Sequence, residues 1–155
     1  MKNITFQVVQ PNETKTIKLI AEWYLNEWKI PIEKTIARIS SFTEFGEEFQ
    51  VLLLQDNIPV STGGLYHKVG LHSKEPRFEK YKNWLAQVYT TPSHRHNGLG
   101  ALICNHIQEL SKTKNIREIL LFTDTAESLY TRLGWATIER LSYDIRNVVV
   151  MNKVL

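Results

Sequence analysis

The sequence predicts an α/β protein of the α+β mixed-sheet kind, in which helices cover a twisted central sheet. The strongest indication is a strand–helix–strand unit: an apolar run at Trp84–Thr90, an amphipathic stripe after Gly98, and a second apolar run at Glu118–Thr123. A helix that links two strands of one sheet usually makes them parallel. A short strand that is apolar throughout is typical of one buried on both faces. Hairpin-like pairs of runs elsewhere add antiparallel neighbours, so we expect a mixed sheet.

The expected elements follow one another as β-α-α-β-β-β-α-β-α-β-β, and turn-forming residues separate most of them. The strands are expected at Ile4–Val9, Phe49–Leu54, Ile58–His67, Trp84–Thr90, Glu118–Thr123, Trp135–Arg140 and Val148–Val154. The helices are expected at Thr14–Trp28, Ile32–Phe42, from Leu99 to at least Leu110, and at Ala126–Leu133.

Local signals justify these boundaries. Apolar residues recur at helical spacing in the first helix, and Pro31 ends it. Asp56-Asn57 lies between two strand-like runs and predicts a hairpin turn, while Gly63-Gly64 inside the second run predicts a bulge or a close backbone approach. Gly134 stands at the left-handed position that commonly ends a helix. Residues Tyr143–Asn147 are expected near the turn between the last two strands.

The segment Lys68–Asn83 is polar and basic and contains Pro76, so we expect a long connection there. A solvated loop is favoured over a surface that recognises an acidic partner. The cations that it carries are Lys68, Lys74, Arg77, Lys80 and Lys82.

Length and composition are those of one soluble globular domain, which we place at residues 1–155. The net charge of +3 suits an anionic ligand but is too small to indicate nucleic acid. The single cysteine, Cys104, excludes an internal disulfide framework and is compatible with a reducing cytoplasm. No apolar run reaches the ~18 residues of a membrane span, and no signal-peptide core is present, so we expect a cytoplasmic protein without membrane contact.

The segment after Thr90 has the features of an anion-binding helix start. Pro92 ends the strand, a polar turn follows, and Gly98 and Gly100 open the next helix. The first N–H groups of a helix have no partner within it and lie at the positive end of its dipole, so they favour an anion. Glycine lets a ligand approach the backbone closely, and the Arg95 guanidinium can bind a phosphate with two hydrogen bonds. The sequence therefore predicts a phosphate site.

Two common phosphate motifs do not fit. No Gly-Lys-Ser/Thr follows the glycines, as a Walker loop requires, and Ile103 stands where a dinucleotide-binding motif would have a third glycine. The Arg-x-x-Gly-x-Gly pattern at residues 95–100 resembles instead the acetyl-CoA pyrophosphate loop of the GNAT N-acetyltransferase superfamily. A second block, Leu120–Asp124 followed by Tyr130-x-x-x-Gly134-Trp135, is similar to the downstream strand and Tyr-x-x-x-Gly-aromatic motif of that superfamily.

This resemblance implies a GNAT-like acyl-CoA N-acyltransferase fold and an enzyme that moves an acetyl group from acetyl-CoA to a primary amine. The amine, on a small molecule or a peptide, would attack directly in a ternary complex. Main-chain groups of Val88 and Tyr89 would pair with the pantetheine arm, and an N–H near Val88 would face the thioester oxygen. The backbone amides that would hold the pyrophosphate are those of Arg95, His96, Asn97, Gly98, Leu99, Gly100 and Ala101. Thr123 would also contact the cofactor, although many members have asparagine there, and a hydroxyl replaces only part of an amide's hydrogen bonding.

The resemblance makes Tyr130 the general acid that protonates the departing thiolate. A phenol with a pKa around 10 can supply a proton to a thiolate whose parent thiol titrates around 8.5. The general base stays open, because a chain of water molecules is as plausible as any side chain. The candidate bases are Glu22, Glu27, His67 and Asp124.

Other candidate groups are weaker. His94 and His96 lack the further ligands that a zinc site needs, so we expect no metal. His106 is expected to be a hydrogen-bonded residue on the apolar stripe of its helix, with Cys104 at the margin of that stripe. Carboxylates and aromatic rings on the first helix could contact a cationic acceptor, although aromatic residues at helical spacing are more often core. These residues are Glu22, Trp23, Tyr24, Glu27 and Trp28.

Two other functions compete with the enzyme. A non-catalytic CoA-binding regulatory module on the same fold would keep the loop but could lose Tyr130. A nucleic-acid module that uses the basic segment would bind with a steep salt dependence, and no stacking motif supports it. A homodimer is possible, because late strands of this fold often meet across dimers.

Overall fold

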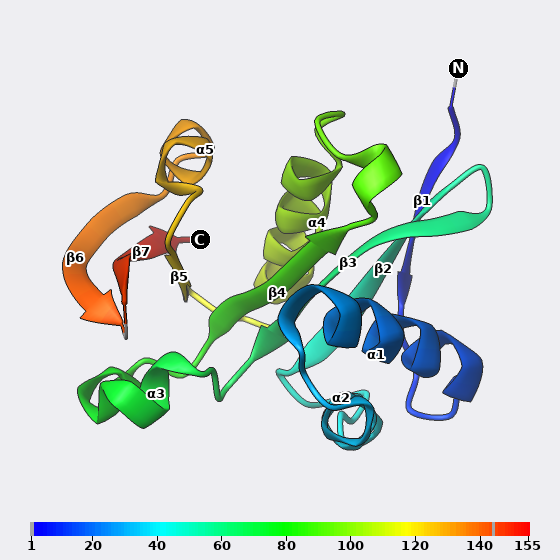
Figure 1. The fold of residues 1–155 in the computed structure, drawn as a ribbon, viewed down its shortest axis with the longest axis horizontal. Coiled ribbons are helices and arrows are strands. Elements are labelled where there is room, and N and C mark those ends of the chain that lie inside the picture. The colour runs from blue at the N-terminus through cyan, green and yellow to red at the C-terminus, as the bar shows by residue number, and fades with distance from the viewer. Residues whose placement is uncertain (1, 144) are drawn as a thin grey trace.

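The computed structural model describes residues 2–143 and 145–155. Its strands form one sheet in the order β1-β2-β3-β4-β5-β7-β6 (Figure 1). Neighbouring strands are antiparallel except for β4 and β5, which are parallel. The mixed sheet and its helical cover confirm the predicted fold class. The strands are β1 Ile4–Val8, β2 Phe49–Gln55, β3 Ile58–Tyr66, β4 Trp84–Thr90, β5 Glu118–Thr123, β6 Ala136–Tyr143 and β7 Arg146–Val154.

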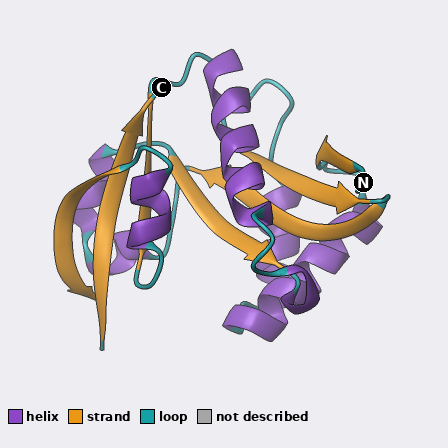
Figure 2. Ribbon diagram, turned by 90° about the horizontal axis from the view of Figure 1, so that it is seen from above, coloured by secondary structure: helices purple, strands orange, loops and turns teal. Residues whose placement is uncertain are grey.

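Helices lie on both sides of the strands (Figure 2). The longest, α1 and α4, span the predicted regions, and α2 and α5 end slightly inside theirs. Within the described residues, no helix is long and apolar enough to cross a bilayer. The helices are α1 Thr14–Trp28, α2 Ile32–Ser40, α3 Leu71–Lys74, α4 Leu99–Thr113 and α5 Glu127–Arg132, with 3-10 turns η1 at Pro76–Lys80 and η2 at Pro92–His94.

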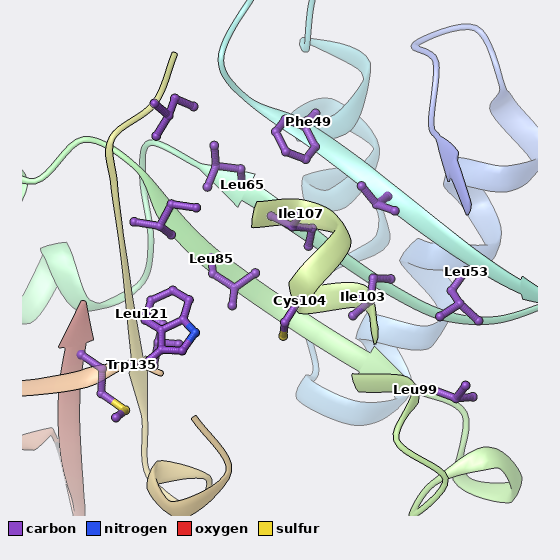
Figure 3. Close-up of a cluster of buried hydrophobic side chains, with 14 of the residues drawn as sticks. Phe49, Leu53, Leu65, Leu85, Leu99, Ile103, Cys104, Ile107, Leu121 and Trp135 are labelled. Atoms are coloured by element: carbon purple, nitrogen blue, oxygen red, sulfur yellow. The ribbon is translucent and has the colours of Figure 1, made fainter. Parts of the chain in front are cut away.

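The alternation of side chains along β2 divides the core between the two faces of the sheet. Leu53 packs with Ile103 and Ile107 of α4, and Figure 3 shows these side chains together. Leu52, the next residue, packs on the opposite face with α1 and α2. Successive residues of a strand point to opposite faces, so a strand that is buried on both sides is apolar nearly throughout.

The predicted hairpin turn at Asp56-Asn57 is confirmed, since both residues have positive φ angles, 52° and 67°. Turns of this kind match the right-handed twist of the two strands that they join. The turn expected near Tyr143–Asn147 lies within that range, and both strands extend further toward it than predicted. Strand β6 reaches Tyr143, which pairs with Arg146 at the start of β7, and residue 144 lies outside the described residues.

The long connection expected at Lys68–Asn83 is wrong in one respect, because it contains α3 and η1. Leu71 and Phe78 are buried against Trp84 and form a third core cluster under the start of β4 and β5. Sparse apolar residues in a polar segment show no periodicity, so the sequence did not reveal that this segment packs against Trp84. The Arg77 guanidinium pairs with the Glu139 carboxylate of β6, which ties the segment to the far edge of the sheet.

Candidate active site

The parallel strands β4 and β5 meet only near their beginnings. Trp84 pairs with Leu120, whose N–H donates to the Asn83 carbonyl over 2.9 Å. Beyond this pair the strands separate toward their C-terminal ends (Figure 1). From Leu85 to Thr90, the edge of β4 that faces β5 therefore has no strand partner among the described residues, and we call it the divergent edge. Three carbonyls of this stretch already accept a side-chain hydrogen bond: Gln87 from Tyr24, Tyr89 from Ser61 and Thr90 from Arg95. The other backbone groups on the divergent edge are available to an extended ligand, which could hydrogen-bond to them as a further strand would.

A β-bulge interrupts β4 beside the divergent edge. On β3, Thr62 pairs with Tyr89 and Gly64 with Ala86, so two β4 residues, Gln87 and Val88, lie between the paired positions opposite Gly63 alone. Gln87 has a φ of 54°, in the left-handed region. Bulges turn backbone groups away from the ladder and are frequent beside active sites. The predicted bulge or close approach at Gly63-Gly64 is confirmed.

The chain passes from β4 through η2 directly into the start of α4. Gly98 has a φ of 78°, and a Cβ atom at Gly98 or at Gly100 would meet no heavy atom within 4 Å. The first turn of α4 carries no acidic side chain and no side-chain cap. Its first N–H groups have no partner within the helix and open onto free space. This geometry suits a phosphate group.

The side chain of Arg95 turns away from the first turn of α4. Its Nε donates to the Thr90 carbonyl over 2.8 Å, and its Nη2 lies 3.1 Å from Glu27 Oε1 on α1. The guanidinium also lies over the Tyr89 ring, 5.5 Å from its centroid. In this conformation Arg95 joins the loop to β4 and α1, so backbone amides rather than the guanidinium face a ligand at α4.

Neighbouring side chains of the loop support its backbone. Asn97 Nδ2 donates to the carbonyls of His94 and Arg95 at 3.3 and 3.2 Å. His94 Nδ1 is hydrogen-bonded to Thr91 Oγ1 at 2.7 Å. His96 is exposed and has a φ of 66°. Within the described residues, no three His, Cys, Asp or Glu side chains are grouped to hold a metal ion.

Tyr130 lies on α5 beside the interior of the sheet. Burial raises the pKa of its phenol well above the usual range, and the neighbouring Cys104 adds to that rise. The Cys104 thiol lies 4.0 Å from the Tyr130 hydroxyl, and burial raises the pKa of this thiol to about 12. Cys104 is 1% exposed, so its predicted place at the margin of the α4 stripe is wrong, since the side chain points into the core. Both groups keep their protons at neutral pH.

Thr123 has a local role at the end of β5. Its Oγ1 accepts hydrogen bonds from the N–H groups of Ala126 at 3.1 Å and Thr125 at 3.4 Å. These bonds support the turn into α5 and leave the hydroxyl one proton for a further partner.

The candidate bases are dispersed. Glu27 is paired with Arg95, and Asp124 lies 3.3 Å from Arg146. His67 follows the end of β3 that pairs with the start of β4, away from the bulge, and lies 3.2 Å from Glu47. Glu22 is exposed on α1. Among the described hydrogen bonds and ion pairs, none of the four candidates contacts Gln87, Val88 or Tyr130.

The aromatic residues of α1 divide between the core and a partly exposed wall beside β4. Trp23 stacks on Tyr89 with 5.3 Å between ring centroids, and Trp28 meets Tyr89 edge-on at 6.1 Å. Trp28 is 43% exposed. Tyr24 is fully buried instead, and its hydroxyl donates to the Gln87 carbonyl of the bulge over 2.7 Å. Of the aromatic residues of the first helix that the sequence suggested as contacts for a cationic acceptor, Trp23 and Trp28 are therefore accessible and Tyr24 is not.

Sequence reasoning missed Gln50, which is fully buried on β2 and hydrogen-bonded to Tyr24. An available signal was its place as a polar residue inside the apolar run Phe49–Leu54. His106 is half-buried on α4, as expected, but the described contacts include a ring stack for it rather than the expected hydrogen bond. His106 stacks on Phe6 of β1 with 4.0 Å between the rings.

Comparisons with known proteins agree with this geometry. A family model described as an acetyltransferase (GNAT) domain matches residues 47–137. The fold is similar to an aminoglycoside 6'-N-acetyltransferase from Enterococcus faecium, with a TM-score of 0.75, 13% identity, and coverage of 97% of this chain and 96% of that one. It is also similar to an aminoglycoside 6'-N-acetyltransferase complexed with coenzyme A, with a TM-score of 0.74 and 13% identity. That match covers 97% of this chain and 96% of the other. A GNAT-family acetyltransferase from Streptococcus pneumoniae matches with a TM-score of 0.70 and 13% identity, over 99% of each chain. No curated protein sequence matches the chain.

Proposed function

The chain belongs to the GNAT acetyltransferase family, and we propose that it transfers an acetyl group from acetyl-CoA to a primary amine on a small molecule or a peptide. The observation that carries this proposal is the divergence of β4 from β5 beside the start of α4. An unpaired strand edge that leads to unpaired helix N–H groups fits a ligand with an amide-containing arm and a pyrophosphate.

The residues present fit this ligand at each end. The main chain of Val88 on the divergent edge would pair with the pantetheine amides. The predicted role of Tyr89 is not supported in the same way, because its carbonyl accepts from Ser61 Oγ of β3 over 2.7 Å and Tyr89 pairs with Thr62. The backbone amides from Arg95 to Ala101 would hold the pyrophosphate, with Gly98 and Gly100 leaving room for it. Acetyl-CoA supplies the reactive thioester.

Two groups of the chain would then act on the reaction. The Val88 N–H at the bulge would donate to the thioester oxygen as negative charge develops there, which lowers the barrier to attack by the amine. Tyr130 would donate its proton toward the departing sulfur. Burial raises the pKa of this phenol, which keeps the proton in place at physiological pH and also makes the phenol a weaker acid than an exposed tyrosine.

The wall formed by Trp23, Trp28 and Tyr89 supports a cationic acceptor. Aromatic faces attract cations, and Trp28 is exposed enough to meet one. Glu27 lies at the same end of α1, although Arg95 already neutralises part of its charge. We therefore propose that the amine approaches from the α1 side of β4.

A release assay tests the proposed function. Coenzyme A release from acetyl-CoA is followed across polyamines, aminoglycosides, amino acids and peptide N-termini, and acetyl-CoA binding is measured by calorimetry. We expect at least one amine class to give turnover. Binding without turnover on any amine would instead support a non-catalytic CoA-binding module.

Tyr130→Phe tests the acid role separately. It should lower kcat with little change in the dissociation constant of acetyl-CoA, because the phenol acts only as the thiolate departs. An unchanged kcat would remove Tyr130 from the mechanism.

A further inference from the structure

A buried network of polar side chains lies directly behind the β4 bulge. It joins Tyr24 of α1, Gln50 of β2, and Thr62 and Tyr66 of β3, and each of these residues is at most 1% exposed. Gln50 Nε2 donates to the Tyr24 hydroxyl at 3.0 Å and to Thr62 Oγ1 at 2.8 Å. Gln50 Oε1 accepts from the Tyr66 hydroxyl. Buried polar side chains are retained only when such partners offset their desolvation, so this network has one preferred arrangement.

The network reaches the backbone at two places: Thr62 donates to the Val51 carbonyl of β2, and Tyr24 reaches the bulge of β4. The Tyr24 hydroxyl accepts from Gln50 and donates to the Gln87 carbonyl over 2.7 Å. Burial raises the pKa of Tyr24, so the hydroxyl keeps the proton that it donates. Gln87 holds a left-handed φ of 54°, which a residue with a Cβ atom adopts only when its surroundings favour it. The hydrogen bond from Tyr24 is one such favourable contact.

The orientation of that carbonyl also sets the orientation of an N–H group. The Gln87 carbonyl and the Val88 N–H belong to the same peptide group, which is planar and trans. The two bonds therefore point in opposite directions. Because Tyr24 holds the carbonyl toward α1, the Val88 N–H points away from Tyr24.

We propose that Tyr24, held by Gln50, is a positioning residue for acetyl transfer that aligns the Val88 N–H with the thioester oxygen. The inference rests on the proposed function and extends it to two side chains that touch neither substrate. Their contribution is to keep the donor aimed before the amine attacks, so that no reorganisation is needed when charge develops.

Tyr24→Phe tests this role, with Tyr66→Phe as the matched control. Each variant removes one buried phenol hydroxyl of the same network, but only Tyr24 contacts Gln87. We expect Tyr24→Phe to lower kcat about tenfold to a hundredfold while leaving the KM for acetyl-CoA within about twofold. Tyr66→Phe should lower the Tm by an amount similar to Tyr24→Phe, but its kcat should fall clearly less. Should Tyr24→Phe fail to fold, Gln50→Met removes the donor to Tyr24, and the same loss of kcat is expected.

An infrared measurement gives a readout besides turnover. A hydrogen bond to the thioester oxygen lowers the carbonyl stretching frequency of bound acetyl-CoA labelled with carbon-13 at the carbonyl. The wild-type protein should show this lowering, and Tyr24→Phe should show less of it. Equal losses of kcat in the two Tyr→Phe variants, or an unchanged frequency in Tyr24→Phe, would overturn the inference and leave the proposed function intact. Failure of the wild-type protein to bind acetyl-CoA would overturn both.

Discussion

Gly64→Ala should destabilise the protein because a methyl group at this position has no room. A Cβ atom there would lie 2.4 Å from Tyr66 Cε1, 2.8 Å from Gln50 Oε1 and 2.9 Å from Tyr66 Cζ. The Tyr66 ring is 1% exposed, and its hydroxyl is hydrogen-bonded to Gln50, so it cannot swing aside without breaking the buried network. The backbone of β3 or the ring must therefore move.

The size of the effect follows from these contacts. Overpacking of a well-filled core costs about 1–3 kcal/mol, and a contact about 1 Å too short places this site in the upper half of that range. Replacing a strand glycine by alanine recovers about 0.5–1 kcal/mol of backbone entropy. The net free energy of unfolding should fall by about 2 kcal/mol, which corresponds to a Tm lower by about 4–8 °C for a chain of this length.

Gly63→Ala is the neighbouring control. Its Cβ atom would lie 3.2 Å from Ile107 Cδ1 and from Val88 Cγ2, which are the ends of side chains that can yield by a few tenths of an ångström. We expect its stability to stay within about 1 kcal/mol of wild type. Urea and thermal unfolding of both variants measure the difference. A Tm for Gly64→Ala equal to or above that of Gly63→Ala would refute the argument that the network is rigid.

Two further predictions concern Cys104 and Thr123. The Cys104 thiol loses its proton near pH 9.0 in the unfolded chain but only at about 12 in the fold, so stability that is fully present below pH 9 is lost as the pH rises toward 12. In urea unfolding, this group should lower the free energy of unfolding by about 1 kcal/mol between pH 7 and pH 10. The free energy of unfolding of Cys104→Ala should therefore fall by about 1 kcal/mol less than that of wild type over the same interval. Thr123→Val removes the acceptor for the Ala126 N–H and should cost about 1 kcal/mol in thermal unfolding, whereas Thr123→Asn keeps an acceptor and should cost less.

Features that depend on neighbours in the chain could be predicted from the sequence. The left-handed residues of the Asp56-Asn57 turn, the long helices α1 and α4, and the helix start at Gly98 each follow from a few consecutive residues. The signals are local because a turn or a helix is built from contacts between residues at most a few positions apart. The same holds for the two GNAT motifs, which are short and lie within the matched region.

Features that depend on distant contacts could not be predicted. The direction of Arg95 is set by Glu27, 68 residues away, and Tyr24 reaches Gln87, 63 residues away. The cover that α3 and η1 provide for Trp84 also has no periodic signal. In each case the partner is chosen by the packing of the whole sheet and its helices.

The sequence by itself determined the strand–loop–helix order around residues 84–103, the unpaired amides at its helix start, and the family to which the chain belongs. Backbone propensities and glycine placement are sufficient for that, because they act within a few residues. The family resemblance also implied that the strand Trp84–Thr90 diverges from the next strand, which the pairing of β4 with β5 confirms. Only the tertiary structure decided that Tyr24 contacts the bulge and that Arg95 turns to α1. These outcomes need the sheet to be assembled, since burial and hydrogen-bond partners exist only when segments far apart in the chain are packed together.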